Sequence, residues 1–424
     1  MQRGRSRIVA VVLALLMGGA GCGAEAPTIP PPSGDRVVLI GVDAATWTVL
    51  RPLMAAGDLP HLKGLVDRGW SGVLMSMEPT LSPALWTTIA TGRVPSEHGI
   101  QGFLAATEDG QEVPVTSNLR RVETLWTIAT RAGRSVNVIG WYVTWPTEVV
   151  NGIMVADRVG PQREAGIVGG TDSFTDEHPG VYPERFVPTV MSLIVRPEDY
   201  LSRREREFHT RHPVHPVDET RTAIAEHVLA EHPADLSMIY LWGIDPMQHY
   251  FWKYHDPASW IGPPMQEGEA ALNGDLVADY YRDTDAFVGR ILARLRPTDT
   301  VLIVSDHGAG PITMYDPKKG ISGDHRVEGV IIAAGPPIRH GTAAEPPSIL
   351  DVTPTVLNLL GLPAGRDMPG RVIEEMLTPA WLEAHPPRRI ATWEPENRVV
   401  DRWPIATKND ETIKEKLRSL GYIE

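Results

Sequence analysis

The chain of 424 residues contains one cysteine, Cys22, and no block of basic residues beyond its N-terminus. A single cysteine excludes an intrachain disulfide, so the fold must depend on its core. The formal net charge of −13 argues against a nucleic-acid binder, because such a protein needs clustered Lys and Arg to neutralise phosphates. An anionic substrate would therefore have to be held by local features such as metal ions.

The N-terminus also lacks an apolar run long enough to cross a membrane. The run Ile8–Met17 is shorter than the ~20 residues of a transmembrane helix. It follows a basic segment and precedes small residues and Cys22, the pattern of an export signal. Cys22 resembles the lipid-modified cysteine of bacterial lipoproteins, although Gly19 replaces the usual leucine three places before it.

We therefore predict an export signal over residues 1–22, with lipidation at Cys22, and ordinary cleavage and secretion as the alternative. Residues 23–34 are rich in proline and predict a tether that holds the domain off the membrane. The protein is expected to be exported and membrane-tethered outside the cytoplasm.

Aliphatic strands alternate with helical segments over residues 35–375, and this alternation predicts one α/β catalytic domain. We expect a doubly wound, mainly parallel central sheet with helices on both faces and a C-terminal extension over residues 376–424. Between Asn151 and His215 the periodicity breaks down, which predicts an inserted cap over the site. The predicted strands are Val37–Val42, Gly72–Met77, Ser135–Gly140, Leu236–Trp242, Thr300–Val304 and Gly329–Ala334, and the predicted helices include Leu59–Arg68, Thr124–Ala132, Asp218–His232 and one long helix over Glu267–Arg296.

Two candidate residues follow the first two strands. Asp43 comes directly after Val37–Val42, at the carboxyl edge where α/β sheets build their sites. Ser82 is predicted to cap a helix in which Pro83 is the first helical position, so its hydroxyl faces the positive helix end. We expect Asp43 and Ser82 on neighbouring strand ends. A purely structural capping role for either residue remains the alternative.

Five further polar residues lie next to the ends of later predicted strands. Asp245 and His249 are four residues apart, so on a helix both side chains share one face and can hold one cation. The alternative is a capping aspartate and a surface histidine. Asp306 and His307 form an adjacent pair on a glycine turn, and His325 precedes another strand. Carboxylate and imidazole ligands suit zinc or another first-row ion.

Taken together, these segments resemble the alkaline phosphatase superfamily, and most of all its type I phosphodiesterase/nucleotide pyrophosphatase branch. The matching stretches are VVLIGVD at Asp43, PTLSPALWTTIATGRVPSEHGI around Ser82, DPMQH at Asp245 and His249, SDHG at Asp306 and His307, GDHR at His325, and the late segment ILDVTPTVLNLLGLP.

The resemblance implies two divalent metal ions, usually zinc. One would be held by Asp245, His249 and His325, and the other by Asp43, Ser82, Asp306 and His307. It also implies that Ser82 attacks phosphorus and that water hydrolyses the phosphoseryl intermediate. The implied activity is hydrolysis of small phosphoric esters, a phosphodiester or pyrophosphate in preference to a monoester.

The chain departs from that branch at three positions. Its nucleophile is usually threonine followed by an aromatic residue, whereas Ser82 is followed by Pro83, which has no N–H. Phe103 stands roughly where the branch has a phosphate-binding asparagine. Tyr240 is either the counterpart of a second stacking aromatic or a core tyrosine.

Two other functions remain compatible with the sequence. A phospho- or alcohol-group transferase would use the same phosphoenzyme beneath a cap that excludes water. A binding lipoprotein would keep the fold without turnover, and the intact nucleophile and ligands argue against it.

We expect Cys22→Ser to release the protein from membranes without changing its specific activity, because only the lipid anchor would be lost. Fractionation of the native host, followed by immunoblotting and an activity assay, measures both. Recovery of the wild-type protein wholly in the soluble fraction would end the lipoprotein hypothesis.

Overall fold

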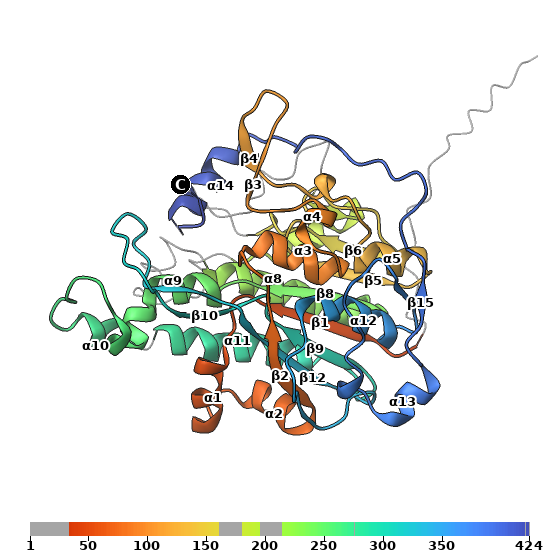
Figure 1. The fold of residues 1–424 in the computed structure, drawn as a ribbon, viewed down its shortest axis with the longest axis horizontal. Helices are drawn as coiled ribbons and strands as arrows, with labels where there is room; N and C mark the ends of the chain where they lie inside the picture. Colours follow the sequence, from red (N-terminus) through yellow and green to blue (C-terminus); the bar gives the residue numbers. More distant parts are fainter. Residues whose placement is uncertain (1–33, 161–179, 196–213, 275, 420, 424) are drawn as a thin grey trace, which may run out of the picture.

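The structure, a computed structural model, describes residues 34–160, 180–195, 214–274, 276–419 and 421–423. Nine strands of this described part form one central sheet (Figure 1). From one edge to the other they are β13 (Gly341–Thr342), β2 (Trp70–Met75), β12 (Glu328–Ala334), β9 (Thr300–Val304), β1 (Val37–Val42), β8 (Leu236–Leu241), β5 (Val136–Ile139), β6 (Gly152–Val155) and β7 (Val181–Tyr182).

The middle of the sheet is parallel. Strands β9, β1, β8, β5 and β6 all pair in parallel, whereas β12 lies antiparallel between β9 and β2, and β7 is an antiparallel edge strand. Every residue of β1, β8 and β9 is buried, as expected for strands covered on both faces. The predicted doubly wound, mainly parallel sheet is confirmed.

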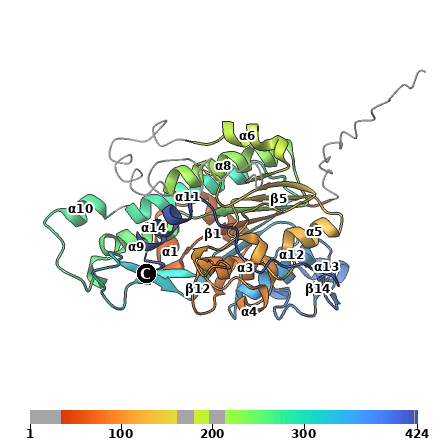
Figure 2. The same cartoon turned by 90° about the horizontal axis from the view of Figure 1, so that it is seen from above.

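Helices cover both faces of this sheet (Figure 2). On one face, α11 (Leu276–Leu292) contacts α8 (Val214–Glu231), α9 (Ile244–His255), α2 (Pro60–Arg68) and α1 (Trp47–Ala56). On the other face, α3 (Ser82–Thr91) contacts α5 (Leu125–Arg131) and α12 (Val352–Leu359). The shorter helices are α4 (Pro95–His98), α6 (Val187–Ser192), α10 (Glu269–Asn273), α13 (Pro379–Ala384) and α14 (Asp410–Ser419). No helix of the described residues has the length and apolar character needed to cross a membrane.

Two predicted segments differ from the structure. The single long helix expected over Glu267–Arg296 is wrong, because α10 ends before Gly274 and α11 starts at Leu276. Glycine has a low helix propensity, which accounts for an interruption there. The predicted start of the cap near Asn151 is too early, because β6 and β7 extend the central sheet instead. Residues 161–179 and 196–213 of the predicted cap lie outside the described residues.

The expectation that Asp43 and Ser82 follow neighbouring strands is also wrong. Strand β2, which leads toward Ser82, is separated from β1 by β12 and β9. Both residues still approach Nε2 of His307, because α3 packs over the end of β1 (Figure 1). The contact uses Gly41, where an added Cβ would lie 2.6 Å from Cζ3 of Trp86. A glycine in β1 therefore allows α3 to approach the sheet closely.

The C-terminal extension wraps around the catalytic domain. Strand β15 (Arg389–Ile390) pairs with β14 (Ala364–Gly365), and Arg398 Nη1 lies 2.6 Å from Oε1 of Glu123. Further along, α14 packs against β4 (Glu112–Pro114), which pairs with β3 (Leu104–Ala106). The described part of the extension therefore belongs to the same packed unit as the sheet.

We expect Gly41→Ala to lower the free energy of unfolding by about 1–3 kcal/mol, because the new methyl group must displace Trp86 from a full core. Equilibrium denaturation measures this loss. Gly64→Ala in the middle of α2 is the matched control, because the site has room and alanine favours helix, so a gain of about 0.5–1 kcal/mol is expected. Equal stability of Gly41→Ala and wild type would contradict the close approach of α3.

Candidate metal centre and nucleophile

Three carboxylates meet at the carboxyl edge of three adjacent strands. Asp43 follows β1, Asp306 follows β9, and Asp245 lies in the first turn of α9, just after β8. Each is at most 1% exposed. The parallel order β9-β1-β8 places the three ends side by side, which is why residues more than 200 positions apart in sequence share one site.

Three histidines complete the cluster. His249 lies one helical turn after Asp245 on α9, and His307 follows Asp306 directly. His325 lies on β11 (Gly323–Arg326), which pairs antiparallel with β10 (Gly308–Pro311). This hairpin folds His325 back over His307, and the two rings stack with centroids 3.8 Å apart.

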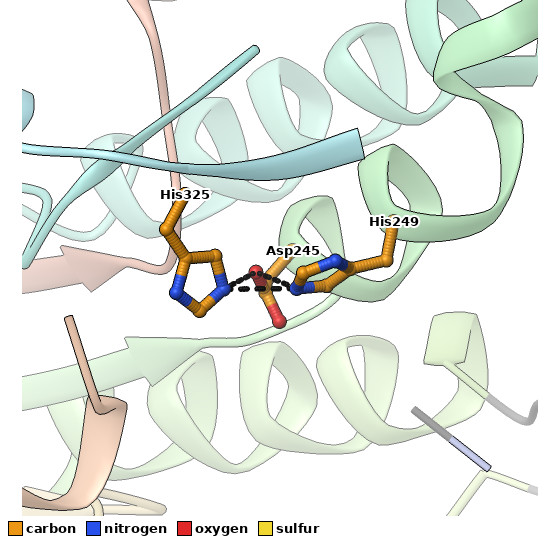
Figure 3. Close-up of side chains that lie close together, drawn as sticks. All are labelled: Asp245, His249 and His325. Carbon is orange, nitrogen blue, oxygen red and sulfur yellow. Dashed lines mark hydrogen bonds and ion pairs between the residues drawn. The ribbon is translucent and has the colours of Figure 1, made fainter. Parts of the chain in front are cut away.

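The first group consists of Asp245, His249 and His325 (Figure 3). Oδ1 of Asp245 lies 3.3 Å from Nε2 of each histidine, and the two Nε2 atoms lie 2.8 Å apart. These three atoms point at one another from α9 and β11, so they can converge on one ion.

The second group is centred on His307. Its Nε2 atom lies 3.5 Å from Oδ1 of Asp43, 3.5 Å from Oδ2 of Asp306 and 3.5 Å from Oγ of Ser82. Asp43, Asp245 and His307 also have ligand atoms within 4.8 Å of one another. Asp245 therefore lies between the two groups, and the structure brings all seven predicted site residues together.

The protonation of all three rings is set by backbone carbonyls. The Nδ1 atoms of His249, His307 and His325 lie 2.9, 2.9 and 2.8 Å from the carbonyl oxygens of Gly323, Gly308 and Thr80, in that order. A carbonyl only accepts, so each Nδ1 carries the proton and donates it. Each Nε2 is therefore the ring atom that faces the cluster and could ligate a metal, as in histidines of metal sites.

The carboxylates repel one another in this buried space. Burial, together with the charge of Asp245, raises the pKa of Asp43 to about 7. Burial and the charge of Asp43 hold the pKa of Asp306 well above its ordinary value. Burial also disfavours the charged form of Asp245, but His249 and His325 outweigh it and lower its pKa. A cation would relieve this repulsion.

His307 has the opposite shift. Burial holds its pKa well below the ordinary value, so its ring is neutral and its Nε2 lone pair is available. Oδ1 of Asp43 and Oδ2 of Asp306 are buried and accept no hydrogen bond from any described residue. Unpaired buried oxygens are costly, and the two carboxylates and the neutral imidazole fit a metal ion.

The helix that carries Ser82 begins one residue earlier than predicted. Ser82 is the first residue of α3 and Leu81 is the cap, so the expected capping role of Ser82 is wrong. The carbonyl of Leu81 accepts the N–H of Ala84 at 2.9 Å. The Ser82 hydroxyl does not cap the helix and lies 3.5 Å from Nε2 of His307. Gly92 ends the helix with φ +67°, as the sequence predicted.

Nearby threonines are engaged elsewhere. Thr87 donates its hydroxyl to the carbonyl of Pro83 at 2.7 Å, in the backward bond expected inside a helix. Thr88 bonds instead to Nε2 of His98 at 3.0 Å. The carbonyl of Thr80 orients His325, so this residue supports the first group.

Sequence reasoning missed the residues that hold the carboxylates. Tyr240 and Trp86 both donate to Oδ2 of Asp43, the indole nitrogen at 3.2 Å, which directs Oδ1 toward His307. Tyr240 is 1% exposed, so the core alternative for this residue is the correct one. Asp218 accepts the N–H groups of Trp242 and Gly243 at 2.9 and 2.8 Å and fixes the turn before Asp245. A buried tyrosine on the neighbouring strand, 197 positions from the aspartate in sequence, leaves no local sequence signal.

The type I phosphodiesterase/nucleotide pyrophosphatase family matches residues 37–345, which include all seven site residues. The chain belongs to this family. It is a phosphoric-ester hydrolase of a metal-dependent family, as the resemblance implied. No curated protein sequence matches the chain.

Solved structures resemble the hydrolase in fold. Human ectonucleotide pyrophosphatase/phosphodiesterase 5 has 14% identity and a TM-score of 0.51, over 81% of this chain and 100% of that chain. The murine protein has 13% identity, a TM-score of 0.50 and the same coverage. Phosphonoacetate hydrolase from Sinorhizobium meliloti has 16% identity and a TM-score of 0.43, over 65% of this chain and 57% of that chain. At such identities the likeness concerns the fold alone.

Substitution of single ligand residues should distinguish the two groups by the metal ion that each variant loses. We expect Asp245→Ala or His325→Ala to lose one metal ion and most turnover, and Asp306→Ala to lose the ion beside Ser82. The reason is that Asp245, although near both groups, is assigned with His325 to the first predicted ligand set, and Asp306 to the second. Elemental analysis of the purified variants measures this. His340→Ala, at an exposed position, is the control and should keep the full metal content. Near-normal metal content in all three ligand variants would disprove the assignment.

Proposed function

We propose that the protein hydrolyses phosphodiesters or pyrophosphates through a phosphoseryl intermediate at Ser82, with two divalent metal ions, zinc being the ion expected. The observation that carries this proposal is the placement of the Ser82 hydroxyl 3.5 Å from Nε2 of His307, the atom that also faces the unpaired oxygens of two buried aspartates. Family membership supports ester hydrolysis, and the residues support the mechanism.

The two ions would be held by Asp245, His249 and His325 on one side and by Asp43, Ser82, Asp306 and His307 on the other. Bound there, they would lower the pKa of the Ser82 hydroxyl and neutralise the charge of the phosphoryl oxygens. The chain supplies the rest by geometry. Tyr240 and Trp86 orient Asp43, and three backbone carbonyls orient the histidines.

Ser82 would act as the nucleophile. Its Oγ forms a bond to phosphorus while the bond between phosphorus and the leaving oxygen breaks, and the leaving alcohol or phosphate takes up a proton. Water then forms a new bond to phosphorus, Ser82 Oγ leaves, and the serine regains its proton. The N-terminus of α3 favours the negative charge on Oγ and on the phosphoryl group.

The substrate class is a phosphodiester or pyrophosphate, and nucleotides are the first candidates to assay. A structure of an inactive variant of the murine relative holds AMP. In this chain Tyr240 is buried against Asp43 and offers no face to a nucleobase, and Pro83 replaces an aromatic residue after the nucleophile. A nucleotide would therefore be recognised through other residues. We also propose that the enzyme is exported and anchored through Cys22.

We expect Ser82→Ala to keep the fold and much of the metal but to lose activity by several orders of magnitude, because covalent catalysis is removed. Hydrolysis of bis(p-nitrophenyl) phosphate measures the loss. Acid quenching during turnover, followed by phosphopeptide mapping, should locate phosphate on Ser82. Thr80→Ala is the control and should still form the phosphoenzyme, since it keeps the carbonyl that orients His325. Phosphate on Thr80, or full activity of Ser82→Ala, would falsify the assignment.

A further inference from the structure

The C-terminal segment reaches the candidate metal centre. Tyr422 donates its hydroxyl to Oδ2 of Asp245, while Oδ1 of the same carboxylate faces His249 and His325. The ring of Tyr422 also meets the ring of His249 edge to face, with centroids 5.4 Å apart. A residue near the chain end therefore contacts two members of the first group, although it lies far outside the stretch that matches the family.

Tyr422 follows a helix end that backbone hydrogen bonds close. Gly421 follows α14 with φ +76°, a conformation that glycine adopts without strain. The N–H of Gly421 donates to the carbonyl of Arg418 at 3.0 Å, and the N–H of Tyr422 donates to that of Leu417 at 2.9 Å. These two bonds form the Schellman motif, which fixes the direction of the residue after the glycine.

Helix α14 is itself anchored. Ile413 and Leu417 are 6% and 4% exposed and form a small apolar cluster with Phe103. The rings of Phe103 and Tyr422 stack with centroids 4.7 Å apart and an interplanar angle of 11°. At the start of the helix, Thr407 donates its hydroxyl to Asp410 at 2.6 Å. Burial and stacking therefore hold the Tyr422 ring in place.

The same helix borders the space beside the nucleophile. A small cavity lies between α14 and the catalytic domain, and it is lined by Pro83, Phe103, Tyr142, Ile413 and Leu417. Pro83 is the residue after Ser82. The C-terminal helix thus borders a cavity that reaches the neighbour of Ser82, and it also supports Tyr422.

We propose that Tyr422 is a positioning residue of the metal centre. Its hydroxyl donates a hydrogen bond to Oδ2 of Asp245. This bond keeps Oδ1 directed at the ion that Asp245, His249 and His325 would bind. The proposal rests on the proposed function, and it assigns to the C-terminal segment a part in assembling the site. Hydrogen-bond donors to ligating carboxylates commonly change metal affinity or activity by about 10–100-fold.

The test compares Tyr422→Phe with wild type in titrations of the metal-free protein with zinc against a competing chelator. We expect the affinity for one zinc ion to fall about 10–100-fold, and the affinity for the other to stay unchanged, because the hydroxyl is lost while the stacked ring remains. Hydrolysis of bis(p-nitrophenyl) phosphate should fall at limiting zinc and recover at excess zinc. A purely structural role would not produce rescue by zinc.

Two further variants sharpen the test. Tyr182→Phe, on the edge strand β7, is the matched control and should bind both ions as wild type does. Gly421→Ala removes no side chain of the site but strains the positive φ, so it should weaken the binding of the same ion by misdirecting Tyr422. It also tests the proposal if Tyr422→Phe fails to fold.

Three outcomes would overturn the proposal. Wild-type affinity for both ions in Tyr422→Phe would show that the hydroxyl does not position Asp245, and would leave the proposed function intact. Higher activity of the variant with unchanged affinity would identify the segment as an inhibitory cover. A wild-type protein that binds no zinc and hydrolyses no ester would refute the proposed function itself, and the positioning role with it.

Discussion

The burial of three aspartates at one edge of the sheet is the constraint on which the site depends. Asp43, Asp245 and Asp306 end or follow adjacent strands, where water cannot screen their mutual repulsion. Polar contacts from the surrounding chain fix two of the carboxylates. Tyr240 and Trp86 donate hydrogen bonds to Asp43, and His249 and His325 face Asp245. The oxygens that remain unpaired are those that face His307.

Packing around a single glycine links this edge to the nucleophile. Because Gly41 has no side chain, Trp86 lies against β1, and its indole nitrogen reaches Asp43. Trp86 is one turn into α3, so the same contact sets the position of Ser82 at the start of that helix. An apolar contact and a hydrogen bond from one tryptophan thus join the fold of the sheet to the chemistry of the site.

The C-terminal segment is held against the catalytic domain by contacts along its length. It crosses the domain through an ion pair at Glu123 and a hydrogen bond at Thr116, and it ends in α14 over Phe103. Phe103 differs from the asparagine that the sequence resemblance implies at roughly this place, and it stacks on Tyr422. The departure at Phe103 is therefore matched by a partner from the end of the chain, and the two residues are best understood together.

The sequence by itself determined six of the nine strands of the central sheet, the candidate ligands and the candidate nucleophile, because aliphatic runs ending in Asp or Asp-His are local patterns. The pair Asp245 and His249 was predictable from helical spacing alone. Only the tertiary structure decided how Ser82 reaches Asp43, because strand order depends on the packing of the whole sheet. It also decided the roles of Tyr240 and Tyr422, since hydrogen bonds between residues 177 or 197 positions apart leave no periodic or local trace.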